Sequence, residues 1–244
     1  MPKKRLDMLL LERGLCDSRN RAQALIMSGS VAVDGIPATK PGAPVKEDAE
    51  IIIKETSPYV SRGGGKLKAA IDSFKISVIG KTCLDIGAST GGFCDCLLQE
   101  GAEKVFAVDV GYGQVAEKLR KDPRVIIMDK TNARFLTPSN FPLKFDLCVI
   151  DVSFISLTLI FPVLPPLMKK NSELIALIKP QFEAGRGKVG KGGVVKSEKT
   201  QNECIEKIRA SLLQLGFNVI GIIPSPLKGA KKANQEFLIY AKLD

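Results

Sequence analysis

The sequence predicts an α/β protein in which a small α+β domain precedes a doubly wound, seven-stranded and mostly parallel sheet. Three observations lead to this fold class. Short apolar segments alternate with helix-like segments from residue 82 onwards, as in parallel sheets covered by helices on both faces. A glycine turn joins the first apolar segment to the helix that follows it. A proline-containing stretch without a clear period, residues 54–62, separates the N-terminal segment from the rest.

The N-terminal segment has the pattern of a compact α+β domain. Two helical patterns fill residues 4–28, and Asp17-Ser18 precedes the second of them as an N-cap. A strand at 31–33, a tight turn at Asp34-Gly35 and a strand at 51–53 follow.

This segment resembles an S4 RNA-binding domain through the motifs Leu-Leu-Leu-Glu-Arg-Gly-Leu, Ser-Arg-x-x-Ala, Ser-Gly-x-Val and Val-Asp-Gly. In such domains a basic helix face meets the RNA backbone. The resemblance therefore implies RNA contacts by Arg5, Arg19 and Arg21. The alternative is that these arginines only form a solvated helix face.

Helices and strands alternate after the linker. Gly63-Gly64-Gly65 leads into a helix whose apolar face carries Leu67, Ala70, Ile71 and Phe74. Apolar runs predict strands at 82–86, 104–108, 125–128, 145–150, 174–178, 217–223 and 236–241, with a helix at about 198–215. We place the two domains at 1–56 and 63–244, with residues 57–62 as the linker.

The first strand-to-helix unit, Thr82 to Phe93, is the stretch around which the second domain is organised. Its apolar run predicts a strand, and glycines 87, 91 and 92 predict a turn that opens a helix. Glycine has no Cβ, so a ligand can approach the backbone of this turn closely. The N–H groups of the first helical turn point towards such a ligand. The alternative is a glycine turn that only connects a strand with a helix.

Three known site types share this strand–glycine–helix outline. Gly87 to Gly91 matches the Gly-x-Ser-x-Gly nucleophile elbow, but the chain contains no histidine that could take the proton of Ser89. A serine at this position also departs from the Gly-x-Gly-x-x-Gly dinucleotide fingerprint. Phe93 stands where a P-loop has its lysine. The remaining interpretation is a nucleoside-bearing ligand that lies across the turn.

The charge balance indicates a polyanionic partner. Lys and Arg number 36 against 26 Asp and Glu, a net charge of +10, which favours nucleic acid or an anionic membrane. Three prolines break the most apolar stretch, Ile155 to Met168, so we expect no membrane-spanning helix. The basic start, Met1–Arg5, is not followed by the apolar segment of a signal peptide.

The cysteines and the missing histidine limit the redox and metal chemistry. Six cysteines are scattered along the chain, several of them in expected strands or helices, which is typical of reduced thiols in a cytoplasmic protein. Without histidine and without a Cys-x-x-Cys pair, we expect no metal site.

Charged side chains follow four of the predicted strands. Asp109, Asp129, Asp151 and Lys179 come at or just after strand ends, whereas Asp85 lies within its strand, where it could orient the turn. The carboxyl ends of parallel strands form the ligand-binding edge of a doubly wound sheet. Asp109, about 20 residues after the glycine turn, is placed to accept hydrogen bonds from ribose hydroxyls. We expect these side chains to share one site, although any single one of them could be a solvated strand end.

Six ordered motifs of the second domain resemble the TlyA family. They are Gly-Ala-Ser-Thr-Gly-Gly-Phe from residue 87, Asp-Val-Gly-Tyr-Gly-Gln from 109, Asp-Pro-Arg-Val from 122, Thr-Asn-Ala-Arg from 131, Asp-Val-Ser-Phe-Ile-Ser from 151 and Lys-Pro-Gln-Phe-Glu from 179. A basic glycine loop after residue 184 matches as well. The resemblance implies S-adenosylmethionine-dependent RNA ribose methylation by a Rossmann-like class I methyltransferase domain of the FtsJ/RrmJ type, behind an S4 domain. The family has also carried the name hemolysin, but the sequence offers no pore.

By motif, the catalytic tetrad of this family falls on Lys66, Asp151, Lys179 and Glu236. A ribose 2′-hydroxyl is a weak acid, so a base must take its proton as the methyl group arrives. In a chain without histidine, a lysine of lowered pKa is the natural base. A second lysine nearby disfavours the charged form of the first, while carboxylates fix its position. We expect Lys179 to be the base and Lys66 to assist it; the alternative for Lys66 is a surface lysine in a first helical turn.

The resemblance also implies the residues that bind the cofactor and the RNA. S-adenosylmethionine would lie on the turn formed by Gly87, Ala88, Ser89, Thr90, Gly91, Gly92 and Phe93, with Asp109 on its ribose and Asp129 and Asn132 near the adenine. Arg62 and the loop at 181–196, with Arg186, Lys188 and Lys191, would contact RNA as a mobile basic flap. One departure is that Tyr59 stands where family linkers usually carry tryptophan, which puts a coupling role of the linker in doubt.

The sequence thus predicts a 2′-O-ribose methyltransferase that acts on ribosomal RNA or a ribosomal subunit, with S-adenosylmethionine as its cofactor. The alternative from another class is a non-catalytic RNA-binding or ribosome-assembly factor that keeps the fold. A membrane-acting cytolysin is a third and more distant alternative.

Overall fold

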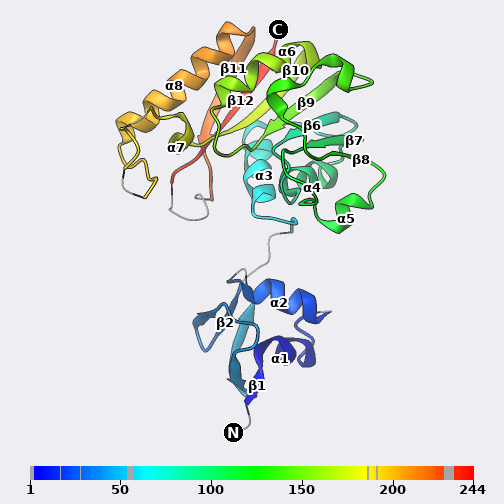
Figure 1. Ribbon diagram of the computed structural model, residues 1–244, viewed down its shortest axis with the longest axis vertical. Coiled ribbons are helices and arrows are strands. Elements are labelled where there is room, and N and C mark those ends of the chain that lie inside the picture. The colour runs from blue at the N-terminus through cyan, green and yellow to red at the C-terminus, as the bar shows by residue number, and fades with distance from the viewer. Residues whose placement is uncertain are drawn as a thin grey trace. The chain divides into compact units, whose positions relative to one another are not determined.

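The computed structural model describes residues 3–16, 18–27, 29–53, 58–185, 187–190, 192–227 and 234–244. The chain divides into two compact units, Met1–Ser57 and Pro58–Asp244. Each unit has a hydrophobic core of its own, and Figure 1 shows the elements of both.

The first unit combines two helices with short antiparallel strands. Its elements are β1 (Lys3–Arg5), α1 (Leu6–Glu12), α2 (Arg19–Met27), β2 (Val31–Val33), β3 (Ile36–Ala38), β4 (Pro44–Lys46) and β5 (Ile51–Ile53). The two predicted helices and the predicted strands at 31–33 and 51–53 are confirmed. The tight turn is confirmed as well: Asp34 and Gly35 have positive φ angles of 47° and 78°, as in a type I′ hairpin turn. Ser18 accepts a hydrogen bond from the Arg21 N–H and so caps α2. Strands β1, β3 and β4 were not predicted, nor was the pairing of β1 with β4.

The second unit contains the predicted seven-stranded sheet. Its strand order is β11-β12-β10-β9-β6-β7-β8. The strands are β6 (Thr82–Ile86), β7 (Lys104–Val108), β8 (Val125–Met128), β9 (Phe145–Ile150), β10 (Met168–Ile178), β11 (Phe217–Pro224) and β12 (Phe237–Leu243). Only β12 runs antiparallel to its two neighbours, β10 and β11. The mostly parallel sheet is therefore confirmed.

Helices cover both faces of this sheet, and each face has its own apolar cluster (Figure 1). One face packs against α3 (Gly63–Phe74) and α4 (Gly92–Gln99), and the other against α6 (Leu164–Leu167) and α8 (Glu198–Gln214). From Leu147 to Ile150, successive residues of β9 alternate between the two clusters, as the two-residue period of a strand requires. This double burial explains why the strands read as continuous apolar runs.

Some boundaries differ from the prediction. β10 begins at Met168, six residues before the predicted start at 174, and its register against β9 shifts between Met168 and Glu173. Glu236 lies immediately before β12 and not within it. Three short helices were not predicted, α5 (Glu117–Arg120), α6 and α7 (Pro180–Glu183). In the part of the chain that the structure describes, no helix is long and apolar enough to span a bilayer.

Candidate active site

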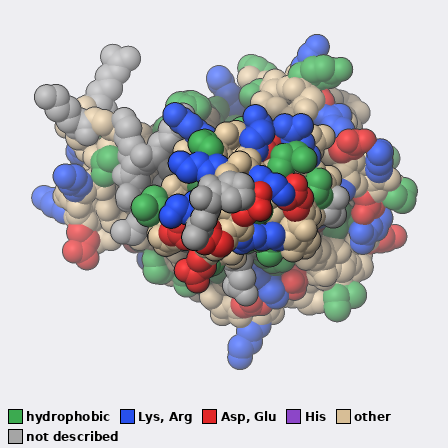
Figure 2. Space-filling model, turned by 90° about the horizontal axis from the view of Figure 1, so that it is seen from below, with side chains coloured by type: hydrophobic (Ala, Val, Ile, Leu, Met, Phe, Trp, Pro, Cys, Tyr) green, Lys and Arg blue, Asp and Glu red, His purple; other side chains and the backbone are tan. Residues whose placement is uncertain are grey.

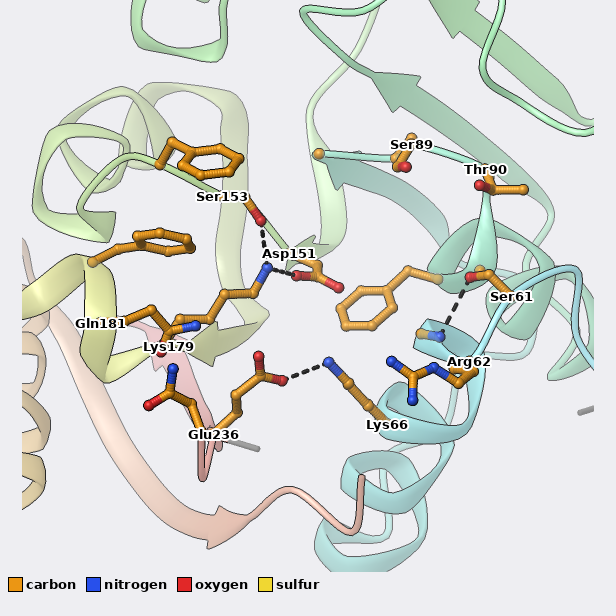
Figure 3. Close-up of a pocket in the computed structure, with 18 of the residues that line it drawn as sticks. Ser61, Arg62, Lys66, Ser89, Thr90, Asp151, Ser153, Lys179, Gln181 and Glu236 are labelled. Atoms are coloured by element: carbon orange, nitrogen blue, oxygen red, sulfur yellow. Dashed lines mark hydrogen bonds and ion pairs between the residues drawn. The ribbon is translucent and has the colours of Figure 1, made fainter. Parts of the chain in front are cut away.

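A cavity of about 600 Å³ lies at the carboxyl ends of β6, β9 and β10. Its wall includes all four residues of the predicted tetrad, the predicted turn residues except Gly91, and Arg62. Figure 3 shows Lys66 and Lys179 reaching into it from opposite sides. The lining residues are Ser61, Arg62, Gly63, Lys66, Gly87, Ala88, Ser89, Thr90, Gly92, Phe93, Asp151, Ser153, Phe154, Lys179, Gln181, Phe182, Val189, Gly193, Asn234 and Glu236.

The turn between β6 and α4 requires glycine for steric reasons. Gly87 has a φ of +85°, and a Cβ there would lie 2.5 Å from the backbone oxygen of Asp151. Gly91 is the N-cap of α4 in a left-handed conformation, and a Cβ at Gly92 would overlap Ser61 Oγ. The turn therefore packs against two neighbouring segments while its backbone stays bare on the side of the cavity.

Asp109, Asp129 and Asn132 lie on loops beside this turn but do not line the cavity. The carboxylate of Asp109 accepts hydrogen bonds of 2.7 Å from the N–H groups of Ser89 and Gly111. Asp129 accepts from the Gly113 N–H at 3.0 Å, and Asn132 caps a short 3-10 turn. These side chains hold the loops that follow β7 and β8 in place, and Asp109 fixes the glycine turn directly.

Lys179 and Asp151 form the first of two lysine–carboxylate pairs in the cavity. Lys179 directly follows β10 and Asp151 directly follows β9, and these strands are parallel neighbours. The Lys179 ammonium lies 2.6 Å from Asp151 Oδ1. It also donates a hydrogen bond of 2.9 Å to the hydroxyl of Ser153. The lysine nitrogen is thus held by two groups of one loop (Figure 3).

Lys66 and Glu236 form the second pair. Lys66 comes from the first turns of α3, and Glu236 from the segment directly before β12. The Lys66 ammonium lies 2.5 Å from Glu236 Oε2, and the two side chains are 10% and 3% exposed. Two residues 170 positions apart in the chain are therefore joined inside the cavity.

Asp85 is a fully buried acid under this site. It lies in β6 with no exposed surface, and neither carboxylate oxygen has a hydrogen-bond partner among the described residues. Burial raises the pKa of Asp85 to about 8, and the charges of Asp151 and Asp109 add to the rise, while the Cys94 N–H opposes it. The sequence left open that Asp85 orients the glycine turn; among the described residues, no hydrogen bond links its side chain to that turn.

The described part of the linker, residues 58–62, packs on the second unit. The Val60 N–H donates to the buried carboxylate of Asp95 at 2.7 Å, and Gln99 donates to the Pro58 carbonyl at 3.1 Å. The Tyr59 ring fills the space that a side chain at residue 64 would need, and burial raises the pKa of Tyr59 to about 12. The position that departs from the family pattern is therefore a packing position against α3.

In the first unit, Arg5 and Arg19 hold the carboxylate of Asp7, which has no exposed surface. Arg5 donates through Nε and Nη2 at 3.0 and 2.9 Å, Arg19 through Nε at 3.1 Å and Gln23 at 3.0 Å. These hydrogen bonds, those of Arg5 foremost, keep the pKa of Asp7 well below its usual range despite burial. Both arginine side chains remain about half exposed, 51% and 50%, and Arg21 is exposed.

The other predicted RNA contacts are only partly within the described residues. Arg186 and Lys191 lie outside them. Lys188 forms an exposed ion pair with Glu203 of α8 at 2.6 Å. Val189 and Gly193 of the same loop line the cavity. On the face shown in Figure 2, lysines and arginines are interspersed with acidic side chains.

Several cavity residues were not singled out from the sequence. Ser153 and Phe154 lie within the motif that begins at Asp151, and Gln181 and Phe182 within the motif that begins at Lys179, so those motifs were the signal that could have identified them. Asn234 begins the motif Asn-Gln-Glu-Phe through which Glu236 was assigned, so that motif was its signal. Its side chain accepts from the Val195 N–H at 2.9 Å and donates to the Gly193 carbonyl at 2.8 Å, which ties the glycine loop to the segment before β12.

Comparisons with known proteins agree with this arrangement. Residues 59–243 match the FtsJ-like methyltransferase family, and residues 4–51 match the S4 domain. The chain is 42% identical over 240 residues to the 16S/23S rRNA (cytidine-2′-O)-methyltransferase TlyA of Mycobacterium tuberculosis, covering 98% of this chain and 89% of that protein. It is 40% identical to Hemolysin A of Brachyspira hyodysenteriae, covering 97% and 98% of the two chains.

A solved structure, a "putative hemolysin" from Streptococcus thermophilus, superposes with a TM-score of 0.78 at 41% identity and covers 100% of this chain and 89% of that one. The matches extend over both units and include the positions of the glycine turn and of both lysine–carboxylate pairs. The chain therefore belongs to the TlyA family, in which an S4 domain precedes an FtsJ-like methyltransferase domain.

Proposed function

We propose that this protein transfers a methyl group from S-adenosylmethionine to the 2′-hydroxyl of a ribose in ribosomal RNA, and that the lysine–carboxylate pairs of the cavity are its catalytic groups. The observation that carries the proposal is the meeting of both pairs with a bare glycine turn in one cavity. The substrate class comes from the TlyA relative, whose name states cytidine 2′-O-methylation of 16S and 23S rRNA.

The cavity fits S-adenosylmethionine in size and in the shape of its backbone wall. A volume of about 600 Å³ lies within the range of small-molecule sites. Side chains at residues 87 and 92 would collide with Asp151 and Ser61, so only glycine leaves the turn bare. The turn at 87–93 would hold the cofactor, with Asp109 accepting from its ribose and Asp129 and Asn132 near its adenine. Each oxygen of Asp109 keeps a free lone pair for that purpose. When bound, S-adenosylmethionine supplies a methyl group already activated on a sulfonium.

Lys179 is the base in this mechanism. Its amine, in the uncharged form, would take the proton of the 2′-hydroxyl as that oxygen accepts the methyl group that bound S-adenosylmethionine supplies. The lysine would end protonated, and the demethylated cofactor would leave as S-adenosylhomocysteine. Asp151 and Ser153 hold the Lys179 nitrogen in place before and after the transfer, so the enzyme contributes proton transfer and orientation.

Lys66 and Glu236 form the opposite wall. Their ion pair is deeply buried, so the Lys66 ammonium is held in one position. From there its positive charge would stabilise the negative charge that develops on the ribose oxygen. Two aromatic rings complete the wall: Phe154, which is 91% exposed, lies 5.2 Å from Phe182 between ring centres. Exposed aromatic faces of this kind stack on unpaired RNA bases.

The first unit supplies a separate contact to RNA. Arg5 and Arg19 keep part of their N–H groups free while Asp7 fixes both guanidinium groups, and planar guanidinium groups suit phosphate oxygens. Arg21, Arg62 and Lys188 add positive charge, as does the net charge of +10. Ribosomal RNA as the substrate places the protein in the cytoplasm, with its cysteines as free thiols.

The test combines calorimetry with methylation mapping. The full chain should bind S-adenosylmethionine and transfer labelled methyl groups to naked rRNA or to isolated ribosomal subunits, and the new 2′-O-methyl group should be located by primer extension. Binding of rRNA without binding of S-adenosylmethionine would favour a non-catalytic assembly factor. Leakage of lipid vesicles without methyl transfer would favour a cytolysin. Either of those results would overturn the proposal.

A further inference from the structure

Glu183 is a buried carboxylate next to the active site that has no part in the mechanism above. It ends α7, and its side chain is 1% exposed. Oε1 accepts a hydrogen bond of 2.7 Å from the Leu157 N–H, and Oε2 accepts one of 2.5 Å from the Ser156 hydroxyl. Lys207 of α8 lies 3.1 Å from Oε2 and balances its charge. A buried carboxylate with this full set of donors holds its partners in fixed positions.

Those partners belong to the loop that carries the catalytic groups. Residues 151–157 and 179–183 lie side by side and are joined at both ends. At one end, Lys179 contacts Asp151 and Ser153. At the other end, Glu183 holds Ser156 and the following N–H. The rings of Phe154 and Phe182, which lie 5.2 Å apart and are tilted by 47°, lie between the two ends.

The middle of this loop has an unfavourable backbone conformation. Phe154 has a φ of +65°, in the left-handed region that residues other than Gly, Asn and Asp rarely adopt. Its side chain is 91% exposed, so core packing does not compensate for the cost. Such a conformation persists when the flanking residues are fixed. Ser153 on one side is fixed by Lys179, and Ser156 on the other by Glu183.

We infer that Glu183 is a positioning residue for methyl transfer: it fixes the loop at 153–157 so that the Ser153 hydroxyl meets Lys179 and the Phe154 ring stays at the mouth of the cavity. This inference rests on the proposed function. Glu183 touches neither cofactor nor ribose and acts through the loop. Its loss should therefore lower the rate of methyl transfer and leave cofactor binding on the glycine turn intact.

The first experiment compares Glu183→Ala and Glu183→Gln with the wild type as full chains. Single-turnover rates are expressed per S-adenosylmethionine-binding site, so that loss of folded protein is not counted as loss of rate. We expect Glu183→Ala to lose about 10- to 100-fold in rate, with an S-adenosylmethionine Kd within about twofold and a changed pH profile. Glu183→Gln should recover most of the rate, because its amide oxygen still accepts from the Leu157 N–H and the Ser156 hydroxyl can turn to accept from its amide N–H.

Glu206→Gln is the matched control, because Glu206 is an exposed acid of α8 one residue from Lys207. Its rate should equal that of the wild type. A Glu183→Ala variant with the wild-type rate per site and the wild-type pH profile would overturn the inference, since Glu183 would then act only in the stability of the fold.

A second measurement separates this inference from the proposed function. The chain contains no tryptophan, so Phe154→Trp introduces a single fluorescent probe into the loop. Adding Glu183→Ala should lower the fluorescence anisotropy of that probe, and adding Glu206→Gln should not. An unchanged anisotropy would overturn the positioning role whether or not rRNA is methylated, whereas absence of methyl transfer by the wild type would overturn the proposed function alone.

Discussion

The two lysine–carboxylate pairs of the cavity consist of the same chemical groups in different surroundings. The side chains of Lys66 and Glu236 are 10% and 3% exposed and make one contact with each other. The side chain of Asp151 is 21% exposed, and its partner Lys179 also has the Ser153 hydroxyl within hydrogen-bond distance. The pair of Lys66 and Glu236 is the more deeply buried. In the other pair Asp151 is partly exposed, and Lys179, which is 11% exposed, shares its ammonium with Ser153.

This difference assigns different tasks to the two lysines. Removing one charge from the buried pair of Lys66 and Glu236 leaves the other charge buried and uncompensated, which costs several kcal/mol. A partly exposed carboxylate, such as that of Asp151, can be solvated by water. Loss of the proton on its lysine partner therefore costs less free energy. In the proposed mechanism, Lys179 would therefore be the lysine that gains and releases a proton, and Lys66 would keep its charge.

The largest effect is expected for Lys179→Ala. Removal of a general base lowers rates by about 10²- to 10⁴-fold. The affinity for S-adenosylmethionine should stay nearly unchanged because the glycine turn is built by other residues. Radiolabel transfer to rRNA gives the rate, and calorimetry gives the affinity. Turnover close to the wild-type level would remove Lys179 from its assigned role.

The next effect concerns stability and tests the buried pair of Lys66 and Glu236. Lys66→Met should lower the free energy of unfolding of the second unit by roughly 3–5 kcal/mol, because the buried Glu236 carboxylate loses its partner. The double variant Lys66→Met with Glu236→Gln should recover most of this loss. Denaturant unfolding of the wild type, both single variants and the double variant gives the coupling energy. Additive losses would show that the two side chains do not depend on each other.

A smaller effect on stability is expected from Asp85, the buried acid beneath the pair of Lys179 and Asp151. The pKa of Asp85 is raised to about 8, above the value of about 4 in an unfolded chain. The folded state thus binds this proton more tightly than the unfolded state does. Its contribution to stability is complete below about pH 4 and declines as the pH rises towards 8.

Asp85→Asn cannot ionise, so its stability should exceed that of the wild type increasingly between pH 5 and 8. Denaturant midpoints at several pH values provide the comparison. It also bears on the two pairs: with Asp85 protonated, Asp151 and Lys179 form a balanced pair as Lys66 and Glu236 do. Parallel stability curves for variant and wild type would mean that Asp85 is ionised in the folded protein.

The sequence was sufficient for the sheet and for the cavity's main groups for identifiable reasons. The strands are buried on both faces, so they appear as apolar runs at 82–86 and 145–150, and the positive φ angles at residues 87 and 91 demand glycine. Lys66 and Glu236, 170 positions apart, were assigned only through the resemblance to a family, because no local pattern links such distant residues.

Other features depend on tertiary contacts that no local pattern encodes. Arg5 and Arg19 have the appearance of a plain basic surface until Asp7 is seen buried between them. The start of β10 at Met168 was not predicted because polar residues at 169–173 interrupt the apolar pattern. The register against β9 shifts over the same residues. Glu183 appeared only as the last letter of a motif, since its role depends on a loop that comes 26 residues earlier.

The most direct test of the central claim is the single-turnover rate of Lys179→Arg at saturating S-adenosylmethionine and rRNA. Arginine keeps the positive charge and can still bind Asp151 and Ser153, but its guanidinium does not release its proton in a protein. If Lys179 is the base, the arginine variant will be as slow as Lys179→Ala at every pH measured. A rate above about one tenth of the wild-type value would contradict the account and would mean that the lysine serves as a fixed charge.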